Sequence, residues 1–122
     1  MLTIRVALNR AMRLDGALGV TVVDYVSRMA LGTASHSKDL DLDQAAHGGT
    51  DVVRAHLSAL KLLGRKPEQL EDILITLDSE YHLIRPLTRR THERLFLLLV
   101  LDRERAEPDA ARQEPQRIED LL

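Results

Sequence analysis

Five histidines are the residues of this sequence whose chemistry best suits metal binding or proton transfer. They are His36, His47, His56, His82 and His92. His47 and His56 are nine residues apart in a helical pattern, whereas a zinc-binding helix presents two histidines four residues apart. The chain also has no cysteine, which removes thiol nucleophiles and thiolate metal ligands. We therefore expect no metal site and no cofactor, and we interpret the histidines as solvated or partly buried.

One short segment brings a hydroxyl, a histidine and carboxylates together, in the order Asp78-Ser79-Glu80-Tyr81-His82. All five residues fall within or beside one predicted turn, and neighbours in a turn do not converge on a substrate. The sequence also lacks the G-x-S-x-G motif that exposes a nucleophilic serine after a strand. Because no nucleophile is paired with a base, we expect a protein that is not an enzyme, rather than a small hydrolase.

Gly48-Gly49-Thr50 is the stretch nearest to a phosphate-binding loop. A P-loop has the pattern G-x-x-x-x-G-K-[ST] after a strand, and no lysine follows these glycines at the required place. We interpret them as helical positions where another backbone can come close.

Asp39, Asp41 and Asp43 alternate just before that helix, as the first ligands of an EF-hand loop do. Such a loop needs glycine at its sixth place and glutamate at its twelfth. Counted from Asp39, those places hold Gln44 and Thr50. Negative charge near a helix N-terminus explains the three aspartates without calcium.

A basic cluster surrounds one predicted loop and consists of Arg85, Arg89, Arg90 and Arg94. The whole chain has a net charge of −2, and only 2% of its residues are aromatic. A nucleic-acid surface needs a broader positive region and stacking rings, so we expect no nucleic-acid partner. The cluster is either a solvated loop or a docking patch for an acidic protein partner.

The element that positions the rest of the chain is Leu95–Leu101, a run of seven apolar residues between two charged ones. It is too short to span a membrane. The run does not alternate with polar residues, which is typical of a strand covered on both faces. We therefore predict a central strand with helices above and below it, in a single domain of residues 1–122.

The remaining patterns predict the order helix, strand, strand, helix, strand, strand, strand, helix. The other predicted strands are Leu18–Asp24, Met29–Ser35, Glu71–Asp78 and Tyr81–Leu87, and the predicted helices are Ile4–Leu14, Asp43–Leu63 and one that begins at Pro108. We expect a kink or break at Pro115, because an internal proline removes a helical hydrogen bond.

The helix predicted at Asp43–Leu63 has two apolar stripes, where one is enough to dock it on its own sheet. One stripe comprises Ala46, Gly49, Val53, Leu57 and Leu60. The second consists mostly of small residues, namely Ala45, Gly48, Val52, Ala55, Ala59 and Leu62. Because small residues let another backbone approach, we predict that a second copy of this helix packs there.

With this order of elements, the sequence resembles the Roadblock family, also called the dynein light-chain roadblock family, over nearly its whole length. The resemblance is carried by Asp15–Asp24, Glu71–Leu77, Tyr81–Leu87, Leu99–Arg103 and Ala111-Arg112, and it points to the stand-alone bacterial members. It implies an α+β sandwich of the profilin-like type. The expected sheet is five-stranded and mostly antiparallel in the order 2-1-5-4-3, with the long second helix on one face and the terminal helices on the other.

The resemblance also implies a two-fold homodimer, in which the second helices pair and the third strands of two subunits form one continuous sheet. The predicted interface comprises Ala45, Gly48, Gly49, Val52, Ala55, Ala59, Leu62, Ile73 and Ile75. Partner docking is assigned to the polar side of the long helix and to the basic loop, namely His47, Asp51, Arg54, Arg89 and Arg90.

In function, the resemblance implies a non-enzymatic regulatory scaffold that binds and modulates small Ras-like GTPases or binds another Roadblock protein. The alternative is a GTPase-independent adaptor in a bacterial signalling or cytoskeletal complex. Because no signal-peptide pattern is visible, we expect a cytoplasmic location without membrane insertion.

Overall fold

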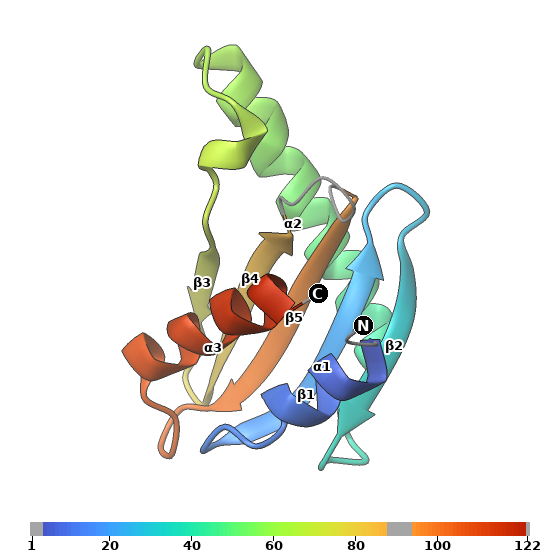
Figure 1. Cartoon of the computed structure of the whole chain (residues 1–122), viewed down its shortest axis with the longest axis vertical. Coiled ribbons are helices and arrows are strands. Elements are labelled where there is room, and N and C mark those ends of the chain that lie inside the picture. Colours follow the sequence, from blue (N-terminus) through green and yellow to red (C-terminus); the bar gives the residue numbers. More distant parts are fainter. Residues whose placement is uncertain (1–3, 88–93, 122) are drawn as a thin grey trace.

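The computed structural model describes residues 4–87 and 94–121, which form one five-stranded sheet with helices on both faces (Figure 1). In chain order the elements are α1 (Ile4–Ala11), β1 (Ala17–Asp24), β2 (Met29–Ser35), α2 (Leu42–Leu62), the 3-10 helix η1 (Pro67–Gln69), β3 (Ile73–Thr76), β4 (Glu80–Leu87), β5 (Leu95–Asp102) and α3 (Pro108–Leu121). The strand order is β2-β1-β5-β4-β3, and neighbouring strands are antiparallel. This order and the predicted fold class are confirmed.

The central strand β5 is buried on both faces, as its unbroken apolar run predicted. Leu97, Leu99 and Leu101 pack in the cluster that includes residues of α1 and α3. Phe96 and Leu98 pack in the opposite cluster, beneath α2. Burial of a leucine contributes about 1.5–3 kcal/mol, so this strand carries a large part of the fold's stability. Figure 1 shows the resulting layers, with α1 and α3 on the near face and α2 behind the sheet.

Both ends of α2 are fixed by local hydrogen bonds. At the start, Asp41 is the N-cap, and its Oδ1 accepts a hydrogen bond from the Gln44 N–H at 3.1 Å. At the end, Gly64 takes a left-handed φ of 71°, and the Arg65 N–H donates to the Leu60 carbonyl at 2.8 Å. This glycine-ended arrangement satisfies the last carbonyls of a helix. The caps therefore define both ends of the helix, including the end that lies beyond the sheet.

The two edge strands, β2 and β3, differ in length, and only β3 departs from its predicted bounds. β2 has the predicted bounds, and its register with β1 shifts between Val22 and Val23, so it contains a bulge beside Gly32. β3 covers only Ile73–Thr76, four residues in place of the eight predicted at Glu71–Asp78. Its far end is cut short by a turn, in which the Leu77 N–H donates to the Glu80 carbonyl at 2.8 Å.

The predicted break in the last helix is wrong. α3 continues from Pro108 to Leu121 through Pro115, whose side chain is buried. Proline still removes the N–H that would bind the Ala111 carbonyl, at a cost of about 3 kcal/mol in an isolated helix. Contacts with the rest of the protein therefore offset the lost hydrogen bond. The sequence shows the proline but does not show these contacts.

Candidate functional site

The two halves of α2 differ sharply in how far the chain's own sheet covers them. All five buried residues of this helix lie between Leu42 and Val53. The second half projects beyond the sheet (Figure 1), and its last leucine, Leu62, is 87% exposed, with Leu63 next to it 70% exposed. Exposed large apolar side chains at the end of a capped helix mark a surface that a partner can cover.

The small-residue stripe lies along the side of α2 that does not face the sheet centre. Its half-buried members are Ala45, Val52 and Ala59, and its exposed members are Gly48, Ala55 and Leu62. Gly48 has open space around its missing side chain, since no heavy atom lies within 4 Å of a Cβ built there. The stripe is therefore most accessible at Gly48, Ala55 and Leu62, whereas Ala45 and Val52 pack partly against the chain's own core.

Gly49 serves a different contact from the other residues of the predicted interface. It is buried against the chain's own sheet, and a Cβ at this position would lie 3.1 Å from Phe96 Cε1. The glycine lets α2 approach β5 closely. Gly49 thus offers no free surface to a second copy.

Strand β3 adds an uncovered edge to this side of the molecule. It is hydrogen-bonded to β4 along one side and is the last strand of the described sheet. Ile73 and Ile75 are half-buried and pack against the cluster beneath α2. The strand contains no charged residue and no proline, the usual devices that keep an edge from pairing. An apolar edge of this kind favours pairing with another strand.

The polar side of α2 turns toward the β1–β2 turn. His47, Asp51 and Arg54 are all exposed, as the docking prediction requires. Asp51 accepts hydrogen bonds from Arg28 Nη1 at 2.6 Å and from Nη2 at 3.3 Å. Arg28 takes a left-handed φ of 68°, which is uncommon for a residue other than glycine. The ion pair thus ties the polar side of α2 to a turn in a strained conformation.

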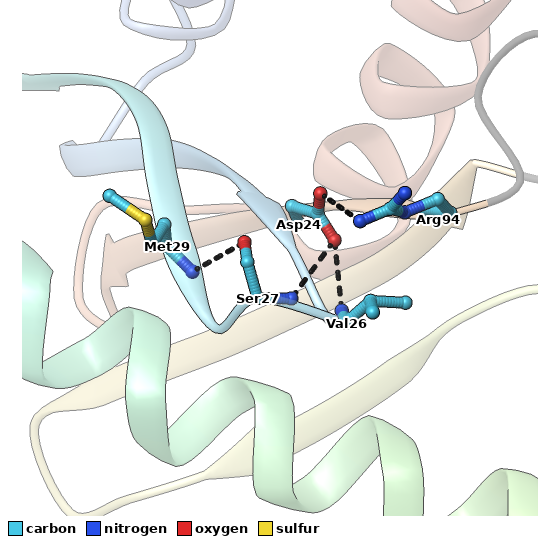
Figure 2. Close-up of polar contacts among 5 residues, drawn as sticks. All are labelled: Asp24, Val26, Ser27, Met29 and Arg94. Atoms are coloured by element: carbon cyan, nitrogen blue, oxygen red, sulfur yellow. Dashed lines mark hydrogen bonds and ion pairs between the residues drawn. The ribbon is translucent and has the colours of Figure 1, made fainter.

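Figure 2 shows how the same turn is held from its other side. The Asp24 carboxylate accepts hydrogen bonds from the N–H groups of Val26 at 2.9 Å and Ser27 at 3.3 Å. Its second oxygen lies 2.9 Å from Arg94 Nη2. Burial raises the pKa of Asp24, but these N–H donors and the Arg94 guanidinium outweigh it, so its pKa lies below the ordinary value of 3.8. The carboxylate therefore stays charged and fixes the turn.

Replacing Asp24 with asparagine should cost about 1 kcal/mol near neutral pH, because the amide oxygen can still accept the Val26 and Ser27 bonds and only the ion pair with the exposed Arg94 is lost. Because the folded pKa is lowered, this stabilisation is present above the unfolded value near 3.8 and is lost as the pH falls through the folded value. Urea unfolding of both proteins across that range measures it. A difference that stays constant down to strongly acidic pH would contradict the assignment.

A pocket of about 290 Å³ opens beside this turn, between α2, η1 and the ends of the strands. Its wall mixes apolar and charged side chains, and it is lined by Tyr25, Leu57, Pro67, Glu68, Pro86, Leu87 and Arg94. Such a hollow is large enough for one bulky side chain of a bound protein. The pocket lies between Leu57, in the uncovered half of α2, and Arg94 of the Asp24–Arg94 pair.

The described residues do not bring catalytic or metal-binding groups together. His82 Nε2 lies 3.0 Å from Glu80 Oε1, so the histidine of the candidate turn is engaged by a carboxylate beside it. No group of three potential metal ligands occurs in residues 4–87 and 94–121. Within the same residues, no helix has both the length and the apolar character that crossing a bilayer requires.

The basic cluster predicted around the loop is partly used inside the protein. Arg94 is paired with Asp24, and Arg85 Nη2 lies 3.0 Å from Glu119 Oε1 in a nearly buried pair. Arg89, Arg90 and His92 lie outside the described residues. Sequence reasoning missed both ion pairs, because their partners are 70 and 34 residues away and no local pattern links them.

Neither a protein-family model nor a curated protein matches the sequence. The fold, however, is similar to solved structures. MglB of Myxococcus xanthus is 16% identical with a TM-score of 0.79, over 93% of this chain and 86% of that one. A Roadblock/LC7 domain from Streptomyces avermitilis is 11% identical with a TM-score of 0.77, over 93% and 89%.

A third structure, the gliding protein MglB of Thermus thermophilus, is 18% identical with a TM-score of 0.70, over 95% of this chain and 87% of that one. At such low identity the similarity shows a shared fold. The chain therefore has the Roadblock fold that its sequence resembles.

Proposed function

We propose that this Roadblock-fold chain is a homodimeric, non-enzymatic scaffold that binds and modulates a small Ras-like GTPase. The observation that carries the proposal is the apolar surface that the chain leaves uncovered: the exposed end of α2, and the unpaired edge of β3, to which α2 is connected through η1. A second copy related by a two-fold axis would pair its own β3 with this one. The α2 stripes would then meet through Ala55, Ala59 and Leu62, since the first half of α2 lies over β1 and β2.

Self-association is also a property of a structural neighbour. One MglB structure, 18% identical to this chain with a TM-score of 0.79, is described as having a tetrameric arrangement. A symmetric contact of this kind uses the same patch on both subunits, so it needs a self-complementary surface. A stripe of small residues next to an uncharged strand edge meets that requirement.

The GTPase partner rests on the resemblance to the Roadblock family together with the exposed polar side of α2, where Asp51 is already paired with Arg28. His47, Asp51 and Arg54 are exposed on the polar side of α2, which faces the β1–β2 turn. The small-residue stripe lies on a different side of the helix, so these three residues would remain accessible in the proposed dimer. The chain has no P-loop of its own. Any effect on GTP hydrolysis would therefore come from reshaping or completing the partner's site.

Capture of small GTPases from the same genome tests this function. Each GTPase is loaded with a GTP analogue or with GDP and passed over the immobilised protein. We expect nucleotide-dependent capture of at least one, and weaker capture by Arg54→Glu, which reverses an exposed charge on the docking side. Arg13→Glu, exposed at the end of α1 on the opposite face, is the matched control and should bind normally.

If the dimer forms but captures no GTPase in either state, the GTPase function is wrong and the GTPase-independent adaptor becomes the better account. If no dimer forms, the scaffold itself is wrong. The two failures are therefore distinguishable.

A further inference from the structure

Helix α3 is anchored by very few apolar contacts. Among its side chains that the structure describes, the buried apolar ones are Ala111, Pro115 and Ile118. Pro115 also leaves the Ala111 carbonyl without its helical donor. A helix of fourteen residues with a central proline does not persist alone in water, so α3 depends on its contacts with the rest of the protein.

Ion pairs supply the remaining contacts, and they reach three different elements. Glu114 Oε1 lies 2.5 Å from Arg10 Nε of α1. Arg112 binds Asp72, just before β3, through two hydrogen bonds of 2.8 and 3.1 Å. These pairs involve side chains that are partly exposed, so dissolved salt can screen them.

The third pair is buried and connects three segments. The side chains of Arg85 and Glu119 are 15% and 6% exposed, and Arg85 Nε and Nη2 lie 3.3 and 3.0 Å from Glu119 Oε1. Arg85 Nη1 also donates to the Glu71 carbonyl at 3.3 Å. Removing one member of such a pair leaves the other charge uncompensated in a poorly solvated site. This pair therefore ties α3 to β4, and loss of either charge would be costly.

We propose that α3 is a releasable cover: it unfolds and leaves the sheet as one unit, while the sheet, α1 and α2 remain folded. Its release would uncover the apolar face of β4 and β5 that includes Leu83, Leu97 and Leu99. Because ion pairs hold α3 on the sheet, its release would be controlled by ionic strength. A charged partner that competes for Arg85 or Arg112 would control it in the same way. This goes beyond the proposed dimer, since α3 and α2 lie on opposite faces of the sheet (Figure 1).

Hydrogen–deuterium exchange of the intact protein tests this proposal. In the wild type, amides of α3 should exchange about tenfold faster than those of β5, or more, as expected for an element that opens separately. Glu119→Gln should accelerate exchange in α3 by about another tenfold and leave β5 unchanged, because it removes one charge of the buried pair. Raising the salt to about 1 M should act in the same direction, because the pairs to Asp72 and Arg10 are screened.

The matched control is Arg117→Gln, which removes an exposed arginine that lies 3.6 Å from Glu114 inside α3 and leaves the Arg10–Glu114 pair in place. Its exchange should stay within about twofold of the wild type. If Glu119→Gln does not fold, Asp72→Asn provides the same comparison at the partly exposed pair. Exchange of α3 as slow as that of β5 in the wild type, or equal acceleration of both in the variants, would overturn the proposal.

Discussion

Replacing both Ala55 and Ala59 with glutamate is expected to convert the protein from a dimer into monomers. Ala55 is exposed and Ala59 half-buried in the single chain, so the fold itself should tolerate the change. In the proposed dimer the new carboxylates would be buried against an apolar helix, and an unpaired buried charge costs several kcal/mol. Sedimentation equilibrium should give a mass near 13.8 kDa for the variant and about twice that for the wild type.

The control for this variant adds the same charge to the same helix on its polar side. Gln44→Glu combined with Ser58→Glu places two carboxylates at exposed positions outside the small-residue stripe. This protein should remain a dimer. If both variants dissociate, net charge rather than the stripe is responsible, and an unchanged dimer in the first variant would remove the stripe from the interface.

Replacing Leu99 with alanine is expected to destabilise the fold by about 2–5 kcal/mol, the range for large-to-small changes in a core. Leu99 has no exposed surface and lies between Val20 of β1 and Leu83 of β4 in the sheet. Because a domain of this kind is stable by about 5–15 kcal/mol in total, the loss is a large fraction. Urea unfolding at one fixed protein concentration measures it, since the proposed dimerisation would make stability concentration-dependent.

Leu31→Ala is the matched control, because the same side chain is 48% exposed on the edge strand β2. Its cost should stay below about 1 kcal/mol. Equal costs at the two positions would mean that the central strand does not carry the core.

The fold could be predicted because its strongest signals are local. The unbroken run Leu95–Leu101 requires cover on both faces, and the helices on the two sides of the sheet supply it. The strand order could be predicted only through the Roadblock resemblance, since periodicity shows which residues share a face but not which strands are neighbours. β3 ends at Thr76 because Leu77 already belongs to the turn with Glu80, so the predicted turn was present but begins earlier than its sequence pattern indicated.

The site was predicted less completely, because much of it depends on distant contacts. The stripe positions along α2 follow from helical spacing, yet Gly49 belongs to the contact with Phe96, which is distant in the sequence. The role of Arg85 changed for the same reason: the buried Glu119 is its partner, not an acidic protein. Pro115 shows the converse, since a strong local signal for a helix break is overruled by ion pairs from three elements.

Single-cysteine cross-linking tests the central claim most directly, because the chain contains no cysteine that would compete. One cysteine is introduced at a time at Ile73, Leu74, Ile75 and Thr76 of β3, and Thr33→Cys on the opposite edge strand is the control. Facing Cα atoms of paired antiparallel strands lie about 4.5–5.5 Å apart, within disulfide range. The account predicts a disulfide-linked dimer on mild oxidation for at least one β3 position and none for Thr33→Cys. Failure of every β3 position to cross-link faster than the control would contradict it.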